Sequence, residues 1–245
     1  MKIAIISGAS SGIGKAISKE LDSMGLDELW LISRSDDQLK MLQAELTTKS
    51  KCIPLDLTIT DSFDYITSLL IENKCEIKYL VASAGVGYTG ILEHNSANEI
   101  SRTIDLNCRA LTLLINITLP FMKNGGKILT VASGAGFLPQ PEFAVYAATK
   151  AYVISLSKAI RKELQSKGIG VTALCPGPVD TNFFSSLKNV KAYKKKYLIS
   201  PEKVAKKSII ALRKNKALCT PTISMKAIHL CAKIFPSSLL LKFTK

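Results

Sequence analysis

Tyr146 and Lys150 are four residues apart in a stretch with helical periodicity, which places the phenol and the ammonium on one helix face. A free phenol has a pKa near 10, too high for a general base at neutral pH. A fixed cation favours the phenolate and lowers that pKa, as acid–base chemistry on an alcohol or ketone requires. Ser133 ends an apolar strand pattern upstream, where its hydroxyl can meet the tyrosine over a substrate oxygen. A Tyr/Lys pair at this spacing is common on solvated helices, so the pair indicates a catalytic site only in combination with Ser133.

A second candidate site is the glycine-rich segment from Ser7 to Gly14, which joins a short β-branched strand to a helix. Glycines there permit a tight turn and the close approach of a pyrophosphate, and the N-terminus of the helix attracts that anion. Turns need glycines in any case, so the strand–turn–helix context is what indicates nucleotide binding.

These residues can meet only if the surrounding elements bring them to one edge of a sheet. Strand patterns occur at Ile3–Ser7, Glu28–Ser33, Lys51–Leu57, Lys78–Ser83, Lys127–Ser133 and Gly170–Cys175. Helical patterns occur near residues 12–24, 35–47, 61–73, 97–122, 146–167 and 201–214. Apolar strands separated by helices predict an α/β fold, a doubly wound parallel sheet with helices on both faces. We expect residues 1–245 to form a single domain.

In the order of its motifs the chain resembles the short-chain dehydrogenase/reductase family over nearly all of residues 1–220. The motifs are Gly8-Ala9-Ser10-Ser11-Gly12-Ile13-Gly14, Asp56, Ala82-Ser83-Ala84-Gly85, Asn107, Ser133, Tyr146 with Lys150, and Pro176-Gly177. The resemblance implies a Rossmann fold of about seven strands and an enzyme that acts on CH–OH groups with NAD(P). It also implies a catalytic tetrad of Asn107, Ser133, Tyr146 and Lys150.

In that family scheme Tyr146 exchanges a proton with the substrate oxygen, and Ser133 holds this oxygen. Lys150 lowers the tyrosine pKa and bonds the nicotinamide ribose, and Asn107 supports a water in the proton relay. The implied cofactor-binding residues are Gly8, Ser10, Ser11, Gly12, Ile13, Gly14, Asp56, Leu57, Ala84, Gly85, Asn107, Tyr146, Lys150, Pro176, Gly177, Val179 and Thr181. Among them Asp56 resembles the carboxylate that binds adenine, and Val179 and Thr181 match positions that contact the carboxamide.

The choice of cofactor depends on the residues after the second strand. An acid about 20 residues beyond the glycine motif accepts hydrogen bonds from the ribose of NAD and repels a 2′-phosphate. The sequence there is Ser33-Arg34-Ser35, and Arg34 can pair with a phosphate through its planar fork. Asp36 and Asp37 are expected to cap the next helix. We therefore expect NADP(H), with NAD(H) as the alternative in which Asp36 binds the ribose and Arg34 is a surface residue.

The substrate is expected to be a hydrophobic ketone, aldehyde or alcohol. In this family a segment corresponding to residues 180–200 closes over the substrate. The expected substrate-binding residues are Ser133, Phe137, Phe143, Phe183 and Phe184. A wall of aromatic side chains favours a hydrophobic carbonyl compound over a sugar.

The net charge of +14 is concentrated near the C-terminus, because residues 188–245 hold 15 of the 33 Lys and Arg but a single acid, Glu202. No nucleic-acid-binding signature accompanies this charge. Within a basic amphipathic tail at about 222–245, Ile228, Cys231, Ala232 and Phe235 are predicted on one helix face, with lysines towards the other. The tail can lie on an anionic membrane, cover the pocket or join a dimer, and the lysines can be merely solvated.

Other features bound the class of protein. Six cysteines without paired spacing predict reduced thiols, and His94 and His229 lack partners at metal-ligand spacing, so no metal is expected. The longest uncharged helical segment, Ala110–Met122, is too short to span a bilayer, and no signal-peptide pattern occurs. We expect a cytoplasmic protein, and the family resemblance implies a homodimer or homotetramer. The alternative function is a non-catalytic, regulatory relative that binds the cofactor.

Overall fold

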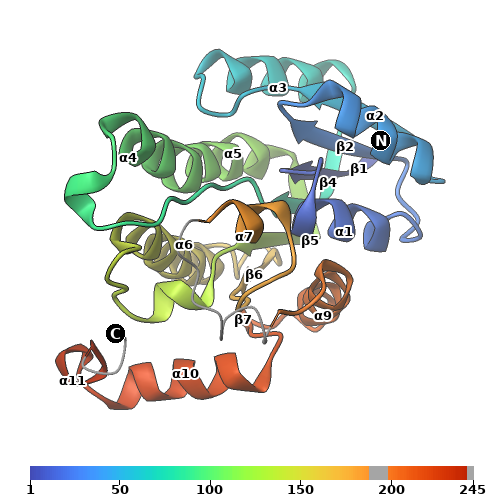
Figure 1. The fold of residues 1–245 in the computed structure, drawn as a ribbon. Coiled ribbons are helices and arrows are strands. Elements are labelled where there is room, and N and C mark those ends of the chain that lie inside the picture. Colours follow the sequence, from blue (N-terminus) through green and yellow to red (C-terminus); the bar gives the residue numbers. More distant parts are fainter. Residues whose placement is uncertain (188–197, 242–245) are drawn as a thin grey trace.

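The computed structural model describes residues 1–187 and 198–241. Within them, seven parallel strands form one sheet in the order β3-β2-β1-β4-β5-β6-β7, with helices on both faces (Figure 1). The strands are β1 (Lys2–Ser7), β2 (Glu28–Ser33), β3 (Ser50–Pro54), β4 (Glu76–Ala82), β5 (Met122–Val131), β6 (Gly170–Leu174) and β7 (Leu218–Cys219). The α-helices are α1 (Gly12–Leu21), α2 (Asp36–Glu45), α3 (Asp61–Glu72), α4 (Ala97–Ile104), α5 (Leu111–Thr118), α6 (Ala144–Glu163), α7 (Asn182–Ser186), α9 (Pro201–Arg213), α10 (Ile223–Ile234) and α11 (Ser237–Leu241). This arrangement confirms the predicted Rossmann-type fold.

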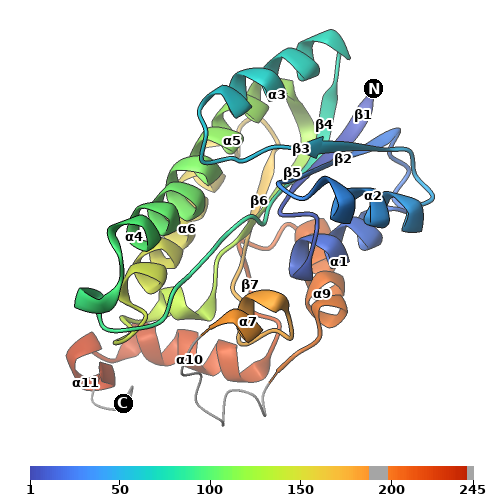
Figure 2. The same ribbon diagram turned by 45° about the horizontal axis from the view of Figure 1, so that its top comes forward.

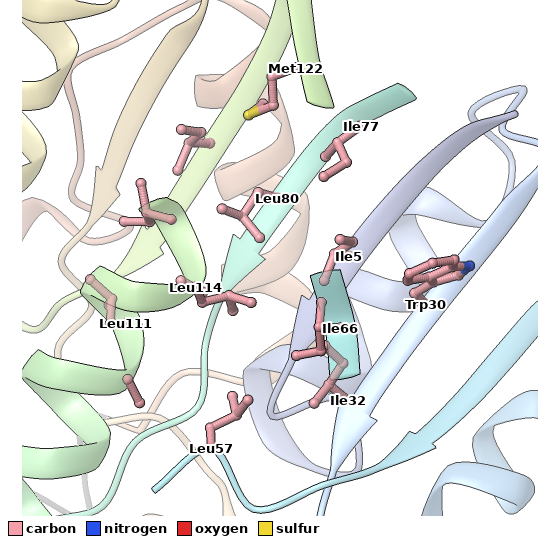
Figure 3. Close-up of a cluster of buried hydrophobic side chains, with 14 of the residues drawn as sticks. Ile5, Trp30, Ile32, Leu57, Ile66, Ile77, Leu80, Leu111, Leu114 and Met122 are labelled. Carbon is pink, nitrogen blue, oxygen red and sulfur yellow. The ribbon is translucent and has the colours of Figure 1, made fainter. Parts of the chain in front are cut away.

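The central strands β1, β4 and β5 are apolar and buried mainly towards their carboxyl ends, where both faces of the sheet are covered. α3, α5 and α6 lie on one face, and α1, α2 and α9 lie on the other (Figure 2). Each face has its own cluster of buried side chains. In the cluster under α5, Leu114 lies opposite Leu80 of β4 (Figure 3). Packing of these two clusters on the sheet fixes the positions of the strands, whose carboxyl ends carry the site residues.

The strand order creates a crevice between β1 and β4. From β1 the chain winds outward through β2 and β3, then returns to the other side of β1 and continues through β4, β5, β6 and β7. The connections after β1 and β4 therefore leave the sheet in opposite directions, and ligands of open parallel sheets bind at such a point.

The predicted helix over residues 97–122 is divided into α4, a π-helical turn at Asp105–Ala110, and α5. A 3-10 turn with Pro120 follows, and β5 begins at Met122, five residues before the predicted start. By length and composition alone, residues 97–121 can cross a membrane. In this fold they instead pack on the sheet, where Leu111 and Leu114 are buried in the core.

Two features near the C-terminus differ from the sequence prediction. The two-residue strand β7 pairs with Ala173 and Leu174 of β6, although it is too short to show strand alternation in the sequence. The predicted apolar face of the tail helix α10 is divided, because Ile228 and Ala232 are partly buried whereas Cys231 and Phe235 are exposed. The side chains that are partly buried are Met225, Ile228, His229 and Ala232.

Candidate active site

A cavity of about 1260 Å³ opens at the carboxyl ends of the strands. The predicted site residues that line it are Gly8, Ser10, Ser11, Gly12, Ile13, Arg34, Asp56, Leu57, Ala84, Gly85, Ser133, Phe143, Tyr146, Lys150, Pro176, Gly177, Val179, Thr181, Phe183 and Phe184. Three others, Gly14, Asn107 and Phe137, lie outside its lining. The fold thus brings most of the predicted set into one hollow.

The glycine turn is closely packed. Gly8 has φ +68°, a left-handed conformation that favours glycine, and a Cβ there would lie 2.9 Å from the Ala84 backbone. Gly14 does not reach the cavity but lies beneath Gly8, since a Cβ at Gly14 would be 2.1 Å from the Gly8 carbonyl oxygen. The turn therefore brings the start of α1 directly against the end of β1.

The N-terminus of α1 fits an anionic group. The N-cap residue, Ser11, makes no capping hydrogen bond with its side chain, and the first turn contains no acid. Both features leave the positive end of the helix dipole open to the cavity. Beside it, the Ser7 hydroxyl accepts hydrogen bonds from the Ser83 and Ala84 amides, at 3.1 and 3.2 Å, and ties the loop after β4 to β1. A dinucleotide pyrophosphate would be held at this helix end.

The charged residues after β2 differ in whether they face the cavity. Arg34 is exposed and lines the cavity, whereas Asp36 pairs with Lys40 at 2.6 Å and does not line it. The N-cap of α2 is Ser35, so the expectation that Asp36 and Asp37 cap this helix is wrong. Both acids instead lie in its first turn, where they interact favourably with the helix dipole.

Asp56 lines the cavity just beyond the end of β3, the strand next to β2. Its Oδ1 accepts hydrogen bonds from the Thr58 amide and hydroxyl, at 2.9 and 2.7 Å. Arg102, on α4, extends towards its Oδ2 with 3.9 Å between Nη2 and oxygen. Among the described side chains, this Nη2 is the only buried polar atom without a hydrogen-bond partner. An unsatisfied donor beside a carboxylate fits a polar ring such as adenine. The sequence did not indicate this role for Arg102, because no motif surrounds it.

Ser133, Tyr146 and Lys150 converge at the end of β5. The Ser133 side chain lies near enough to the Tyr146 phenol to act on its pKa, and the Ser133 hydroxyl accepts a hydrogen bond from the Ala135 amide at 3.1 Å. Lys150 is buried, donates to the Val131 carbonyl at 2.9 Å and lies 5.5 Å from the centre of the tyrosine ring. The three groups therefore face one point of the cavity.

Burial sets the protonation of this group. It raises the pKa of Tyr146 to about 12, although the neighbouring Ser133 side chain acts in the opposite direction. Burial also lowers the pKa of Lys150 to about 8. We predicted that Lys150 lowers the tyrosine pKa, but in this structure desolvation of the phenol is the largest influence and the pKa is raised.

Asn107 lies in the π-helical turn, a distortion that is frequent at functional sites. Its Oδ1 accepts from the Val86 amide at 2.9 Å, and its Nδ2 donates to the Val86 carbonyl at 2.8 Å and to the Thr149 hydroxyl at 3.0 Å. The Thr149 hydroxyl in turn donates to the Tyr146 carbonyl at 2.7 Å. Asn107 thus joins the loop after β4 to the helix that carries the tyrosine.

The tyrosine ring is confined on several sides. Phe143 stacks on it with 4.3 Å between ring centres, and Phe183 lies 5.5 Å away. The loop after β4 passes so close that a Cβ at Gly87 would lie 2.5 Å from the Cδ2 atom of Tyr146. Sequence reasoning missed Gly87, whose role depends on a contact between distant segments. This packing sets the direction of the phenol.

The substrate end of the cavity is largely apolar. Phe143, Phe183 and Phe184 line it as predicted. Phe137 does not, because its ring lies 4.4 Å from the His229 ring of α10. Leu187, on the segment expected to close over the substrate, and Ile228, on the predicted tail helix, also line the cavity. Sequence reasoning missed three further apolar lining residues, Ile91, Met225 and Leu241. Most of the segment at 180–200 that is expected to close over the substrate, residues 188–197, lies outside the described residues.

Comparisons with known proteins agree with this geometry. The family model described as short chain dehydrogenase matches residues 2–192. An uncharacterized oxidoreductase of Staphylococcus epidermidis is 33% identical over 182 residues, which cover 74% of this chain and 79% of that protein. The chain therefore belongs to the short-chain dehydrogenase/reductase family. It is an oxidoreductase that acts on CH–OH groups with NAD(P).

Two further matches describe its relatives. The very-long-chain 3-oxoacyl-CoA reductase of Macaca fascicularis is 33% identical over 183 residues, covering 71% of this chain and 58% of that protein. A short-chain dehydrogenase from Sphingobium yanoikuyae in complex with NADPH has a TM-score of 0.82, with 24% identity, and covers 99% of this chain and 96% of that one. The second match supports the fold alone.

Proposed function

We propose that the chain is an NADP(H)-dependent oxidoreductase that interconverts a hydrophobic ketone or aldehyde and its alcohol, with Tyr146 as the acid/base. The observation that supports this most directly is the convergence of Ser133, Tyr146 and Lys150 on one point of a large, partly apolar cavity. The remaining cavity residues fit a dinucleotide, through the open N-terminus of α1 and the groups at Arg34 and Asp56.

In carbonyl reduction Tyr146 donates its proton to the substrate oxygen. With a pKa of about 12 the phenol is protonated at neutral pH, and Ser133 holds the same oxygen by a hydrogen bond. Lys150 stabilises the phenolate that forms, because a nearby cation favours the charged form. The nicotinamide cofactor, when bound, supplies or accepts the hydride. The reverse sequence oxidises the alcohol.

The preference for NADP(H) is supported by the end of β2. Arg34 lines the cavity there, and its guanidinium can pair with a 2′-phosphate. The carboxylate that would serve NAD(H), Asp36, is engaged with Lys40.

The substrate class follows from the other end of the cavity, where aromatic and aliphatic side chains surround the tyrosine. Such a wall favours an alkyl or aryl carbonyl compound. The name of the macaque relative, a reductase of very-long-chain 3-oxoacyl-CoA, agrees with an apolar ketone.

Calorimetric titration with NADPH and NADH, followed by a ketone panel with the preferred cofactor, tests the proposal. We expect Tyr146→Phe to lower kcat by about 10²–10⁴-fold while NADPH still binds. Tyr152→Phe is the matched control, because Tyr152 lies on the same helix with its hydroxyl against Thr112 and outside the cavity. Binding of NADPH without turnover of any ketone would instead identify the non-catalytic, regulatory protein.

We further propose a homodimer or homotetramer in the cytoplasm. Ile104 on α4 is 47% exposed, and α4 and α6 are the helices whose counterparts pair in this family. All six cysteines, which lie within the described residues, are unpaired, in agreement with a reducing compartment. Light scattering on the purified protein gives the mass, and a monomer would refute this part of the proposal.

A further inference from the structure

Helix α10 is apolar on two opposite sides. Met225 and Ile228 on its inner side line the cavity, and Met225 is wedged against Gly134 and Gly177. On its outer side Ile223, Leu230 and Ile234 are 84%, 58% and 63% exposed. At 3.6 residues per turn the outer three recur on a single stripe. A helix that only covered a pocket would carry polar residues there.

Exposed apolar residues also follow α10, and cations border the stripe. Phe235, the C-cap of α10, and Leu239, within α11, are 47% and 41% exposed. Lys226 and Lys233 lie along one margin of the stripe, and no Asp or Glu occurs in the sequence after Glu202. An apolar stripe bordered by lysines is complementary to an anionic bilayer, which takes up the apolar side chains while the ammonium groups remain at the headgroups.

The position of α10 connects this stripe to the active site. In both views α10 and α11 lie at the margin of the molecule, beyond the ends of β6 and β7 (Figures 1 and 2). Leu241, at the end of α11, lines the same cavity as Tyr146. One helical segment therefore has an apolar outer surface and forms part of the wall around the substrate end.

We propose that the outer stripe of α10 and α11, formed by Ile223, Leu230, Ile234, Phe235 and Leu239, docks this protein on an anionic membrane surface. Docking places the substrate end of the cavity next to the lipid. The substrate is then a lipophilic carbonyl compound or alcohol dissolved in the bilayer. This last step rests on the proposed function, whereas docking itself does not.

Co-sedimentation with vesicles of equal parts phosphatidylglycerol and phosphatidylcholine tests the docking. The full chain should sediment with these vesicles, less with pure phosphatidylcholine, and less in molar salt. Leu230→Ser and Ile234→Ser should each weaken vesicle binding about tenfold. Joint replacement of Lys226 and Lys233 by Gln should weaken it about fivefold for each lysine removed. Ile71→Ser on α3 is the matched control, because Ile71 is 62% exposed on a different helix.

These substitutions remove no buried contact, so the variants should turn over a soluble ketone such as cyclohexanone like the unmodified chain. The docking proposal is wrong if the unmodified chain ignores the anionic vesicles, or if the serine variants bind as well as the control. It is also wrong if the serine variants instead convert an oligomer to a smaller species in light scattering, because the stripe is then a protein interface.

The source of the substrate is tested with a long-chain methyl ketone incorporated into the vesicles. The serine variants should reduce this ketone about tenfold more slowly at limiting lipid, with cyclohexanone turnover unchanged. Equal rates on the vesicle-borne ketone would refute delivery from the bilayer. If no ketone is reduced by any form while sedimentation follows the expected pattern, the proposed oxidoreductase function fails and the docking surface stands.

Discussion

Lys150 is a buried cation without a carboxylate partner. None of the ion pairs among the described residues involves it, and its ammonium is held by the Val131 carbonyl. Burial of an ammonium without a counter-ion disfavours its charged form, so its pKa falls to about 8. The same lysine stands beside the phenol that is proposed to exchange protons with substrate. The buried ammonium that the proposed reaction requires at this position therefore lowers the stability of the fold.

The low pKa of Lys150 should make stability depend on pH. Between pH 8 and the ordinary lysine value of 10.5, the unfolded chain keeps its proton and the folded chain has lost it. The free energy of unfolding then rises with pH, by at most about 1.4 kcal/mol per pH unit. The full penalty for burying the charge applies below pH 8, where both states are protonated.

Thermal unfolding followed by circular dichroism tests this dependence. The Tm of Lys150→Met minus that of the unmodified chain should be constant below pH 8 and decrease from pH 8 to 10.5. The same difference for Lys162→Met, an exposed lysine of the same helix, should not change in this window. A parallel course for the two variants would contradict a lowered lysine pKa.

Arg34 should determine the choice between the two cofactors. Replacing it by Ser removes a charge-assisted hydrogen bond to the 2′-phosphate, so the Kd for NADPH should rise about 10- to 100-fold. The Kd for NADH should stay within about twofold, since NADH lacks this phosphate. Calorimetric titration measures both constants. Lys49→Ser, an exposed lysine paired with Glu28, controls for the loss of one positive charge. Unchanged NADPH affinity in Arg34→Ser would make Arg34 an ordinary surface residue.

At the scale of elements, the loop after β4 sets the orientation of the catalytic helix. The backbone of Val86 is clamped by Asn107, and Gly87 touches the ring of Tyr146. Since the ring is stacked on Phe143 on another side, it cannot turn aside freely. A small change in this loop should therefore move the reacting oxygen.

Gly87→Ala should lower kcat on the best ketone about 100-fold, because the new methyl group displaces the tyrosine ring and misplacement by about 1 Å has such an effect. The NADPH Kd serves as the internal control and should not change greatly, whereas the Tm should fall modestly because the added methyl group overpacks the site. A Gly87→Ala enzyme with full kcat would show that the ring has space that the packing does not indicate.

The elements that could be predicted from the sequence are those whose signal is local. The glycine turn, the Tyr/Lys spacing and the apolar strands depend on neighbouring residues, and the structure places them as expected. Arg102 and Met225 reach the cavity, and Gly87 reaches the Tyr146 ring, only through the tertiary fold, so their sequence neighbours do not indicate these contacts. The π-helical turn could not be predicted either, because the sequence analysis searches for the α-helical period of 3.6 residues per turn. The sequence could not show which side of α10 packs against the protein, because apolar residues occur on both sides of this helix.

At the scale of the whole molecule, stability depends on two separate cores that share one sheet. The cluster under α3, α5 and α6 contains Leu114, which is 1% exposed and lies against β4. Removing part of such a side chain leaves a cavity in addition to the lost burial of apolar surface. The sheet transmits that loss to both sides of the molecule.

Leu114→Ala should lower the free energy of unfolding by about 2–5 kcal/mol, measured by urea denaturation. Ile71→Ala, on the exposed side of α3, should change it by less than about 0.5 kcal/mol. Similar effects of the two substitutions would mean that the core around α5 is less tightly packed than the structure indicates.

Trp30 is the only tryptophan of the chain and is fully buried on β2, with its Nε1 donating to Glu28 at 2.7 Å (Figure 3). A single indole shielded from water emits at short wavelength, and its emission shifts to the red when water reaches it. The chain thus contains its own optical reporter, located between β1 and β3. Because no second indole contributes, any red shift reports the opening of this half of the sheet.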